Sequence, residues 1–267
     1  KNFKYIAYGN KPLNIINEEN NQIFNQNSMI FYYNMNSEDY SSTIYDNSSN
    51  QIHCAVVGSD LKIDSIIDKS LDFNGETYAY SNTTLAIDAS QDYTLGLWFK
   101  ASNLTDISSG TIFESFINIS YDYINNKLII SGNEFDCDKN YHFLCLHFNH
   151  TSNTVKVYID CIDYGQFNFA ITSSSHKIYL GTNNLTNNNF YGEIDNIWLL
   201  GKTLNDVQMS YIFNNKISVI SHMGNRMSYY ELTDDEIYDD TDNNYLLIQS
   251  YIKSMDINNE HTMLTYD

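Results

Sequence analysis

The stretch HFLCLHFNHTSNTVKVYIDC, residues 142–161, decides the fold class. Apolar and polar residues alternate along much of His142–Asn149 and Val155–Cys161, which is typical of strands with one buried face. Between these runs lies His150–Thr154, a short connection made only of polar residues, which predicts a turn. The stretch therefore predicts a β-hairpin of two adjacent antiparallel strands.

The same period-two pattern extends in both directions, from about Ser28 to Phe213. The runs are short, polar turns separate them, and helical periodicity is nearly absent from this part of the chain. Besides the hairpin, the pattern predicts strands at Met29–Tyr33, Leu71–Phe73, Thr94–Lys100, Gly110–Glu114, Lys127–Ser131, Lys177–Gly181 and Tyr191–Leu199. Many short strands separated in this way predict an all-β sandwich of two sheets.

A short helix is expected at LNDVQMSYIF, residues 204–213. Asn205 is a residue type that accepts a hydrogen bond from the first turn of a helix, so it can cap this one. Val207, Tyr211 and Ile212 then recur on one face, which we expect to lie against a sheet.

A second helix is expected in the tail beyond Lys216. Thr233 followed by Glu236 has the spacing of a capping box. Apolar residues then recur with helical spacing at Tyr245, Ile248, Ile252 and Met255. Seven carboxylates and no base also fall in this region, which predicts a solvated connector: Glu231, Asp234, Asp235, Glu236, Asp239, Asp240 and Asp242.

The composition bounds the class of protein. Hydrophobic residues make up 42% of the chain, which excludes an intrinsically disordered protein. The formal net charge is −19, and such a surface repels phosphates and anionic lipid headgroups, so we expect no nucleic-acid or membrane-surface partner. No run approaches about 18 consecutive apolar residues, so we expect no membrane insertion. Residues 1–21 lack the apolar core of a signal peptide. Four cysteines are too few for a disulfide scaffold, and whether they form two bridges or four thiols stays open.

A series of short motifs occurs in a set order. They are MIFYYNMNSED (29–39), DNSSN (46–50), LDFNG (71–75), YTLGLWFKAS (93–102), GTIFES (110–115), YHFLCLHF (141–148), VKVYIDC (155–161), IYLG (178–181) and FYGEIDNIWLLGKTLNDVQMSYIF (190–213). In this order they resemble the laminin G-like domains of the concanavalin A-like lectin/glucanase superfamily, which includes the pentraxins. The resemblance implies that residues 28–216 form a two-sheet antiparallel jelly roll. Residues 1–27 and 217–267 have no counterpart, and we expect them to be extensions used for attachment or assembly, the second one acidic and partly helical.

Because the superfamily includes β-glucanases, the sequence must be tested for hydrolysis. Retaining glycosidases need two carboxyls about 5 Å apart, which the glucanase signature supplies as Glu-x-Asp-x-(x)-Glu on one strand. Glu193 and Asp195 begin this pattern, but Ile197 and Trp198 occupy the two positions where the second Glu could stand. We therefore expect no enzyme and no catalytic residues, and a carboxylate from another loop is the alternative.

Calcium is the cofactor to consider, because lectin-like sandwiches often use it. Calcium takes six to eight oxygen ligands, several of them anionic. The loop at residues 182–190 has no carboxylate, so a ligand-bridging site of the pentraxin kind is not expected there. For Asp46 and Asp195 two interpretations stay open: a structural Ca²⁺ held with backbone carbonyls, or acceptance of backbone N–H bonds in turns.

Sugar binding needs aromatic faces and planar amides or acids. Two Asn- and Tyr-rich segments, which we expect to be loops, offer both and give these candidate residues: Tyr121, Asp122, Tyr123, Asn125, Asn183, Asn184, Asn188 and Tyr191. Trp98 and Trp198 fall in predicted strands, so we expect them in core or sheet-face packing.

These observations favour a noncatalytic recognition or adhesion module that binds carbohydrate. The acidic surface suits a viral or phage particle component, such as a fibre or decoration protein on the virion surface that meets a host-surface glycan. Two alternatives stay open: a structural decoration protein without a ligand, whose partners are other virion proteins or copies of itself, and a secreted, extracellular adhesion protein.

Overall fold

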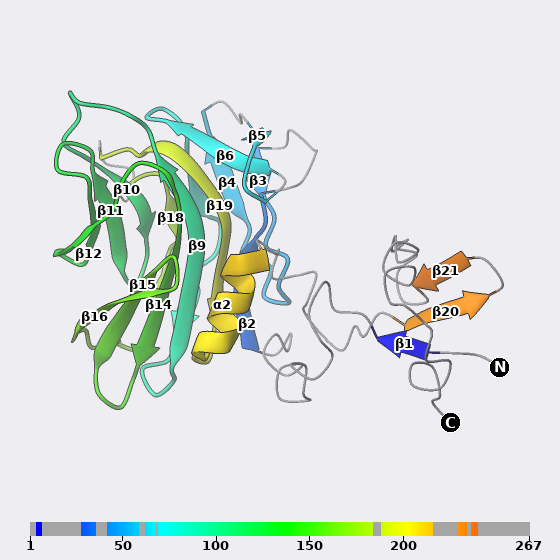
Figure 1. Cartoon of the computed structure of the whole chain (residues 1–267). Helices are drawn as coiled ribbons and strands as arrows, with labels where there is room; N and C mark the ends of the chain where they lie inside the picture. Colours follow the sequence, from blue (N-terminus) through cyan, green and yellow to red (C-terminus); the bar gives the residue numbers. More distant parts are fainter. Residues whose placement is uncertain are drawn as a thin grey trace. The chain divides into compact units, whose positions relative to one another are not determined.

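A computed structural model describes residues 4–6, 28–35, 42–58, 62–67, 69–183, 188–215, 229–233 and 236–239. The chain divides into two compact units. One is Phe24–Ser221, and the other combines Lys1–Ile23 with His222–Asp267 (Figure 1).

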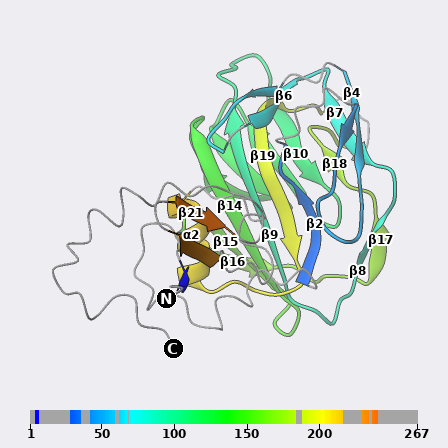
Figure 2. The ribbon, with the colours of Figure 1, turned by 90° about the vertical axis from the view of Figure 1, so that its right-hand side faces the viewer.

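Two large antiparallel sheets form the layers of the Phe24–Ser221 unit (Figures 1 and 2). The front sheet has the order β16 (Ile162–Asn168), β15 (Thr154–Ile159), β14 (Tyr141–Asn149), β9 (Tyr93–Ala101), β19 (Tyr191–Leu200), β6 (Lys69–Asn74) and β5 (Lys62–Asp64), and β2 (Met29–Tyr33) also pairs with β19. The back sheet has the order β13 (Asn133–Asp136), β12 (Lys127–Ile130), β11 (Asn118–Asp122), β10 (Ser109–Glu114), β18 (Tyr179–Leu180), β7 (Tyr78–Ser81), β4 (Cys54–Val57) and β3 (Thr43–Ile44). A separate two-stranded sheet pairs β8 (Leu85–Ile87) with β17 (Ser174–His176). The predicted all-β, two-sheet sandwich is confirmed.

The main core lies between the two sheets. Alternate residues of each strand point inward, as Leu95, Leu97 and Phe99 do from β9 and Ile119 and Tyr121 do from β11. All five side chains are fully buried. Burying each such side chain contributes about 1.5–3 kcal/mol, so this layer is the main source of stability.

The outer face of the front sheet is buried as well, under α2 (Asp206–Asn215). Trp98, Phe143 and Trp198 lie outside the inter-sheet core and are nevertheless no more than 1% exposed. The ring of Phe213 in α2 stacks on Trp98, with ring centroids 5.7 Å apart and planes at 10°. The expectation that both tryptophans pack in the core or on a sheet face is confirmed.

The helix begins as the sequence predicts. The Gln208 N–H donates to Asn205 Oδ1 at 2.9 Å, and the Asn205 N–H donates to Gln208 Oε1 at 2.9 Å. Ile212 is buried, as expected of a residue that faces the sheet. The side chains of Val207 and Tyr211 lie outside the described part of the chain.

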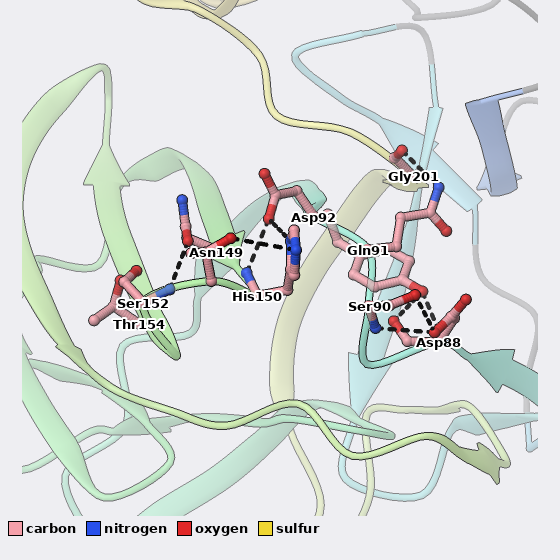
Figure 3. Close-up of polar contacts among 11 residues, drawn as sticks. Asp88, Ser90, Gln91, Asp92, Asn149, His150, Ser152, Thr154 and Gly201 are labelled. Carbon is pink, nitrogen blue, oxygen red and sulfur yellow. Dashed lines mark hydrogen bonds and ion pairs between the residues drawn. The ribbon is translucent and has the colours of Figure 1, made fainter.

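The hairpin that set the fold class is present between β14 and β15 (Figure 3). Asn149 pairs with Thr154, and the Ser152 N–H donates to Asn149 Oδ1 at 2.9 Å within the turn. Asp92, from the loop before β9, accepts the His150 N–H at 2.8 Å and lies 2.7 Å from His150 Nδ1. These polar contacts join the turn to its neighbouring loop.

The other predicted strands are present too, but the alternation missed several. β3, β4, β5, β7, β8, β11, β13, β16 and β17 were not predicted. β16 is exposed along nearly its whole length, so it has no apolar face to reveal it. β11 contains Tyr121 and Asp122, which the sequence analysis placed in a loop because their neighbours are polar.

The prediction of a capping box in the tail is wrong. Thr233 ends β20 (Tyr229–Thr233) and Glu236 begins β21 (Glu236–Asp239), and the two residues pair across an antiparallel ladder. The aromatic and aliphatic residues of these segments favour strands. Glu231, Glu236 and Asp239 of the acidic run therefore lie in strands rather than in a connector. The expected helix at residues 245–255 lies outside the described residues.

The N-terminal and C-terminal extensions meet in one sheet. β1 (Lys4–Ile6) pairs with β20, which also pairs with β21. The domain boundaries expected from the sequence, after residues 27 and 216, stay predictions, because the contacts group the two ends of the chain together.

All four cysteines are free thiols: Cys54, Cys137 and Cys145 are buried and Cys161 is partly exposed. Among the described residues, no helix has the length and apolar character needed to cross a membrane.

Replacing Asn205 by Ala removes the hydrogen bond from the Gln208 N–H and should lower the free energy of unfolding by about 1 kcal/mol. Urea denaturation followed by tryptophan fluorescence measures this change. Asn205→Asp is the matched control, because Asp caps helices about as well as Asn. Equal stability of the Ala and Asp variants would show that the cap contributes nothing.

Candidate functional site

Two tyrosines of the sequence-predicted sugar site lie in the core. Tyr121 is 0% and Tyr123 1% exposed. The Tyr121 hydroxyl donates to Cys137 O at 2.7 Å, while the Tyr123 hydroxyl donates to Tyr191 O at 3.1 Å and accepts the Tyr191 N–H at 2.7 Å. Neither ring has a face open to a sugar, so the prediction that they stack on a ligand is wrong. The cause is the period of β11, which points Tyr121 inward.

The polar residues next to these tyrosines form the turn between β11 and β12. Asp122 Oδ1 accepts the N–H groups of Ile124 and Asn125, both at 2.9 Å. Asp122 Oδ2 accepts Asn125 Nδ2 at 2.8 Å. Asp122 is therefore engaged in holding the turn, whereas Asn125 stays exposed.

The two predicted stretches meet at one end of the sandwich. Asn188 Nδ2 donates to Thr111 Oγ1 at 3.0 Å, and Asn188 Oδ1 accepts Ser109 Oγ at 3.3 Å. Ser109 in turn pairs with Asp122 in the back sheet. The sequence prediction thus grouped residues that lie close together, although most of their polar atoms bind the protein itself.

The remaining residues of that prediction differ in their surroundings. Tyr191 is partly buried, and its ring lies against Gly75, where an added Cβ would come within 2.1 Å of it. Asn183 is partly buried. Asn184 lies outside the described residues.

Asp46, one of the two candidate calcium ligands, organises a turn. Asp46 Oδ1 accepts the N–H groups of Tyr32 at 2.9 Å and Ser48 at 2.8 Å. Asp46 Oδ2 accepts Ser48 Oγ and the Ile52 N–H, both at 2.8 Å. Four donors thus converge on one buried carboxylate, which is the turn-capping interpretation left open by the sequence.

Asp195, the other candidate ligand, is fully buried on β19. Asp195 Oδ2 accepts Ser65 Oγ at 3.0 Å, and Asp195 Oδ1 accepts Asn196 Nδ2 at 2.7 Å. Burial raises the pKa of Asp195 to about 7, although these hydrogen bonds oppose the rise. Within the described residues, no group of three or more His, Cys, Asp or Glu side chains is placed to hold a metal ion.

A different surface combines aromatic and polar groups, on the outer face of the back sheet. Tyr78 and Tyr80 in β7 point outward, because Ala79 between them points into the core. Tyr80 pairs with Tyr179 of β18, which in turn pairs with Glu114 of β10. We call the outward residues Tyr78, Tyr80, Tyr179, Glu114, Asn118 and Lys177 the tyrosine face. Figure 2 shows β7, β10 and β18 in the layer remote from α2.

The hydroxyl groups of Tyr78, Tyr80 and Tyr179 differ from those of the most deeply buried tyrosines in their hydrogen bonding. Five tyrosines that are no more than 1% exposed each donate their hydroxyl hydrogen to a protein oxygen: Tyr32, Tyr33, Tyr93, Tyr121 and Tyr123. Tyr78, Tyr80 and Tyr179 are only partly buried. Their hydroxyls make no hydrogen bond to any residue in the described part of the chain, so they are free to bind a ligand.

Charged and amide groups border the three rings. Asn118 Nδ2 donates to Glu114 Oε2, which fixes the carboxylate beside Tyr179. Lys177 Nζ lies 5.7 Å from the centre of the Tyr80 ring. The tyrosine face therefore offers aromatic surface, a carboxylate and an amide on the four neighbouring strands β7, β18, β10 and β11, with an ammonium group just before β18.

This surface was not among the sites predicted from the sequence, although one signal of it is present there. The alternation in YAYS (78–81) places Tyr78 and Tyr80 on the same side of a strand. That Tyr179 lies beside Tyr80 depends on the pairing of β7 with β18, whose sequences are about one hundred residues apart. Only the register of the sheet reveals this neighbour.

No protein-family model and no curated protein sequence matches this chain. Several solved structures are similar in fold. The binding domain of Paraclostridial Mosquitocidal Protein 1 has a TM-score of 0.56 and 14% identity, over 72% of this chain and 53% of that one. The binding domain of botulinum neurotoxin DC in complex with SialylT has a TM-score of 0.54 and 16% identity, over 71% and 52%. Thus this chain spans about half the length of these toxin domains.

A third structure is matched over nearly its whole length. It is domain 4 of the extracellular arabinanase AbnA from Geobacillus stearothermophilus, in complex with arabinotriose. The TM-score is 0.53 and the identity 18%, over 69% of this chain and 98% of that domain. At these identities the likeness shows the β-sandwich fold that binding domains share, and the laminin G branch stays a prediction.

Asp195 generates a prediction about pH. Because its pKa in the folded protein is about 7, above the ordinary 3.8, the native state holds the proton more tightly than the unfolded state. The stability that this proton contributes is complete below about pH 4, declines as the pH rises toward 7 and is lost above it. Asp195→Asn removes this dependence, so the variant should become more stable than the wild type, by on the order of 3 kcal/mol at pH 8.

Thermal denaturation between pH 4 and pH 9 tests this prediction. Asp106→Asn, at an exposed carboxyl, is the control and should follow the wild type at every pH. A constant difference between Asp195→Asn and the wild type across the whole range would contradict the account.

Proposed function

We propose that the sandwich is a noncatalytic saccharide-binding module and that the tyrosine face is its binding surface. The observation that carries the proposal is the group of three outward tyrosines whose hydroxyls have no partner among the described residues. A sugar ring has apolar C–H faces, which pack on aromatic rings, and a rim of hydroxyls, which bind carboxylates and amides. The tyrosine face supplies both kinds of group.

Similar structures support a saccharide ligand to different degrees. The arabinanase domain was solved with arabinotriose, and this chain matches nearly all of it. The neurotoxin DC binding domain was solved with SialylT and, separately, with rat synaptotagmin II, but this chain matches only about half of it. SialylT and synaptotagmin II therefore give weaker support for the ligand class of this chain than arabinotriose does.

The surroundings of Glu193 and Asp195 support a noncatalytic role. Lys100 Nζ lies 2.8 Å from Glu193 Oε1, and Asp195 is closed off from solvent. Ile197 and Trp198, at the positions of the missing second Glu, are fully buried. A pair of accessible carboxyls, which glycoside hydrolysis requires, is not formed by these residues.

The setting of the module stays a prediction. A place on a virion surface or outside the cell, a host-surface glycan as the ligand, and assembly into homo-oligomers or with virion proteins were inferred from composition and from the resemblance. The saccharide proposal does not depend on any of them.

Replacing Tyr179 or Tyr80 by Ala should weaken saccharide binding at least tenfold, about 1.4 kcal/mol, because truncating an aromatic anchor removes most of its contact surface. Affinity electrophoresis through arabinan, xylan, galactan or xyloglucan measures the dissociation constant. Each run is repeated with calcium and with a chelator, which also tests the structural Ca²⁺ that the sequence left open.

Tyr164→Ala is the matched control, since Tyr164 is 39% exposed but lies on β16 of the front sheet. It should bind as the wild type does. If Tyr179→Ala and Tyr80→Ala are both retained by a polysaccharide as strongly as the wild type, the binding site does not lie on the tyrosine face. If no polysaccharide retains the wild-type protein, the proposed function is contradicted.

A further inference from the structure

The spacing of the tyrosine face fits a chain of sugars rather than a single one. Glu114, Tyr179, Tyr80 and Ala55 pair successively across the strands β10, β18, β7 and β4. Adjacent strands lie about 4.8 Å apart. One unit of an extended glycan advances by a similar distance, so successive sugars can lie over successive residues of this row.

The ends of the row differ in size and chemistry. At one end Glu114 and Asn118 present a hydrogen-bonded carboxylate and amide. At the other end Ala55 pairs with Tyr80 on one side and with Thr43 of β3 on the other. The row therefore has polar groups that can fix one end of a glycan and smaller side chains at the other.

The charges of this face oppose an anionic ligand. Glu114 lies directly beside Tyr179, so a carboxylate or sulfate on a sugar stacked there would meet a like charge. Lys127, farther along the outer face of the back sheet, is already paired with Asp136 at 2.6 Å. Lys177 lies over the Tyr80 ring, and the whole chain carries a formal net charge of −19. The single ammonium group of Lys177 does not offset the negative electrostatic potential that this net charge produces.

We propose that the tyrosine face takes an uncharged, linear oligosaccharide of at least two units, which runs across the strands of the back sheet. This inference rests on the proposed function and names its ligand class. Tyr179 and Tyr80 stack under consecutive sugars. Glu114 accepts hydrogen bonds from sugar hydroxyls, and Asn118 holds the Glu114 carboxylate in place.

Isothermal titration of the whole chain tests the charge of the ligand with matched pairs of probes. Trigalacturonic acid is compared with its trimethyl ester, and 3′-sialyllactose with lactose, so that within the first pair only the charge changes. In 0.1 M salt the neutral member should bind at least about tenfold more tightly. In 1 M salt, where charges are screened within about 3 Å, the difference should shrink, while the affinity for the neutral member stays constant.

Two variants test which residues cause the preference for a neutral over an anionic saccharide. Glu114→Gln keeps an acceptor but removes the charge, so the ratio of neutral to anionic affinity should fall at least about threefold. Lys177→Ala should leave that ratio unchanged or larger. Loss of anionic binding in Lys177→Ala, together with a wild-type preference for the anionic member, would overturn the inference.

A length series from arabinose to arabinohexaose tests the number of units. Affinity should rise at least about tenfold between the first and the third member and then level off. A monosaccharide that binds as tightly as the longer members would contradict the row of sugars. These outcomes differ from failure of the proposed function itself, in which no member of any series binds the wild-type protein.

Discussion

Burial of both faces of the front sheet is the constraint on which the rest of the structure depends. Its inner face packs on the back sheet, and its outer face carries Trp98, on which Phe213 of α2 stacks, and the fully buried Trp198. Gly96 shows how tightly this second layer is packed, because an added Cβ would come within 2.1 Å of the Trp198 ring. The part of the outer face around Trp98 and Trp198 is therefore closed to a ligand, whereas β16 at the edge of this sheet is exposed.

Among the described residues, the outer face of the back sheet carries side chains that are only partly buried, so this is where a surface of side chains stays available. Strand alternation then decides which residues occupy it. In β7 the inward position belongs to Ala79, and the tyrosines on either side of it are turned outward. Pairing with β18 and β10 adds Tyr179 and Glu114 to the same face. The layered fold and the location of the proposed site thus have one cause.

Local sequence patterns predicted the strands in which buried and exposed residues alternate, and the helix that begins with a common capping residue. The hairpin at 142–161, the two-sheet sandwich and the Asn205 cap all follow from spacing along the chain. Strands without an apolar face, such as β16, gave no such signal. Local reasoning also misplaced Tyr121, because a tyrosine between polar residues reads equally well as a loop residue or as the inward member of a strand.

The candidate site was harder to predict, because it depends on register rather than on spacing. Residues chosen for their types, such as Asp46 and Asp122, turned out to satisfy backbone donors, which polar side chains in turns commonly do.

Amide chemical shifts of the labelled protein, recorded while a neutral oligosaccharide is titrated, test the central claim most directly. The account predicts that the shifts concentrate in β7, β10 and β18. Shifts confined to residues 122–126 and 188–191, or to the α2 side of the front sheet, would contradict it.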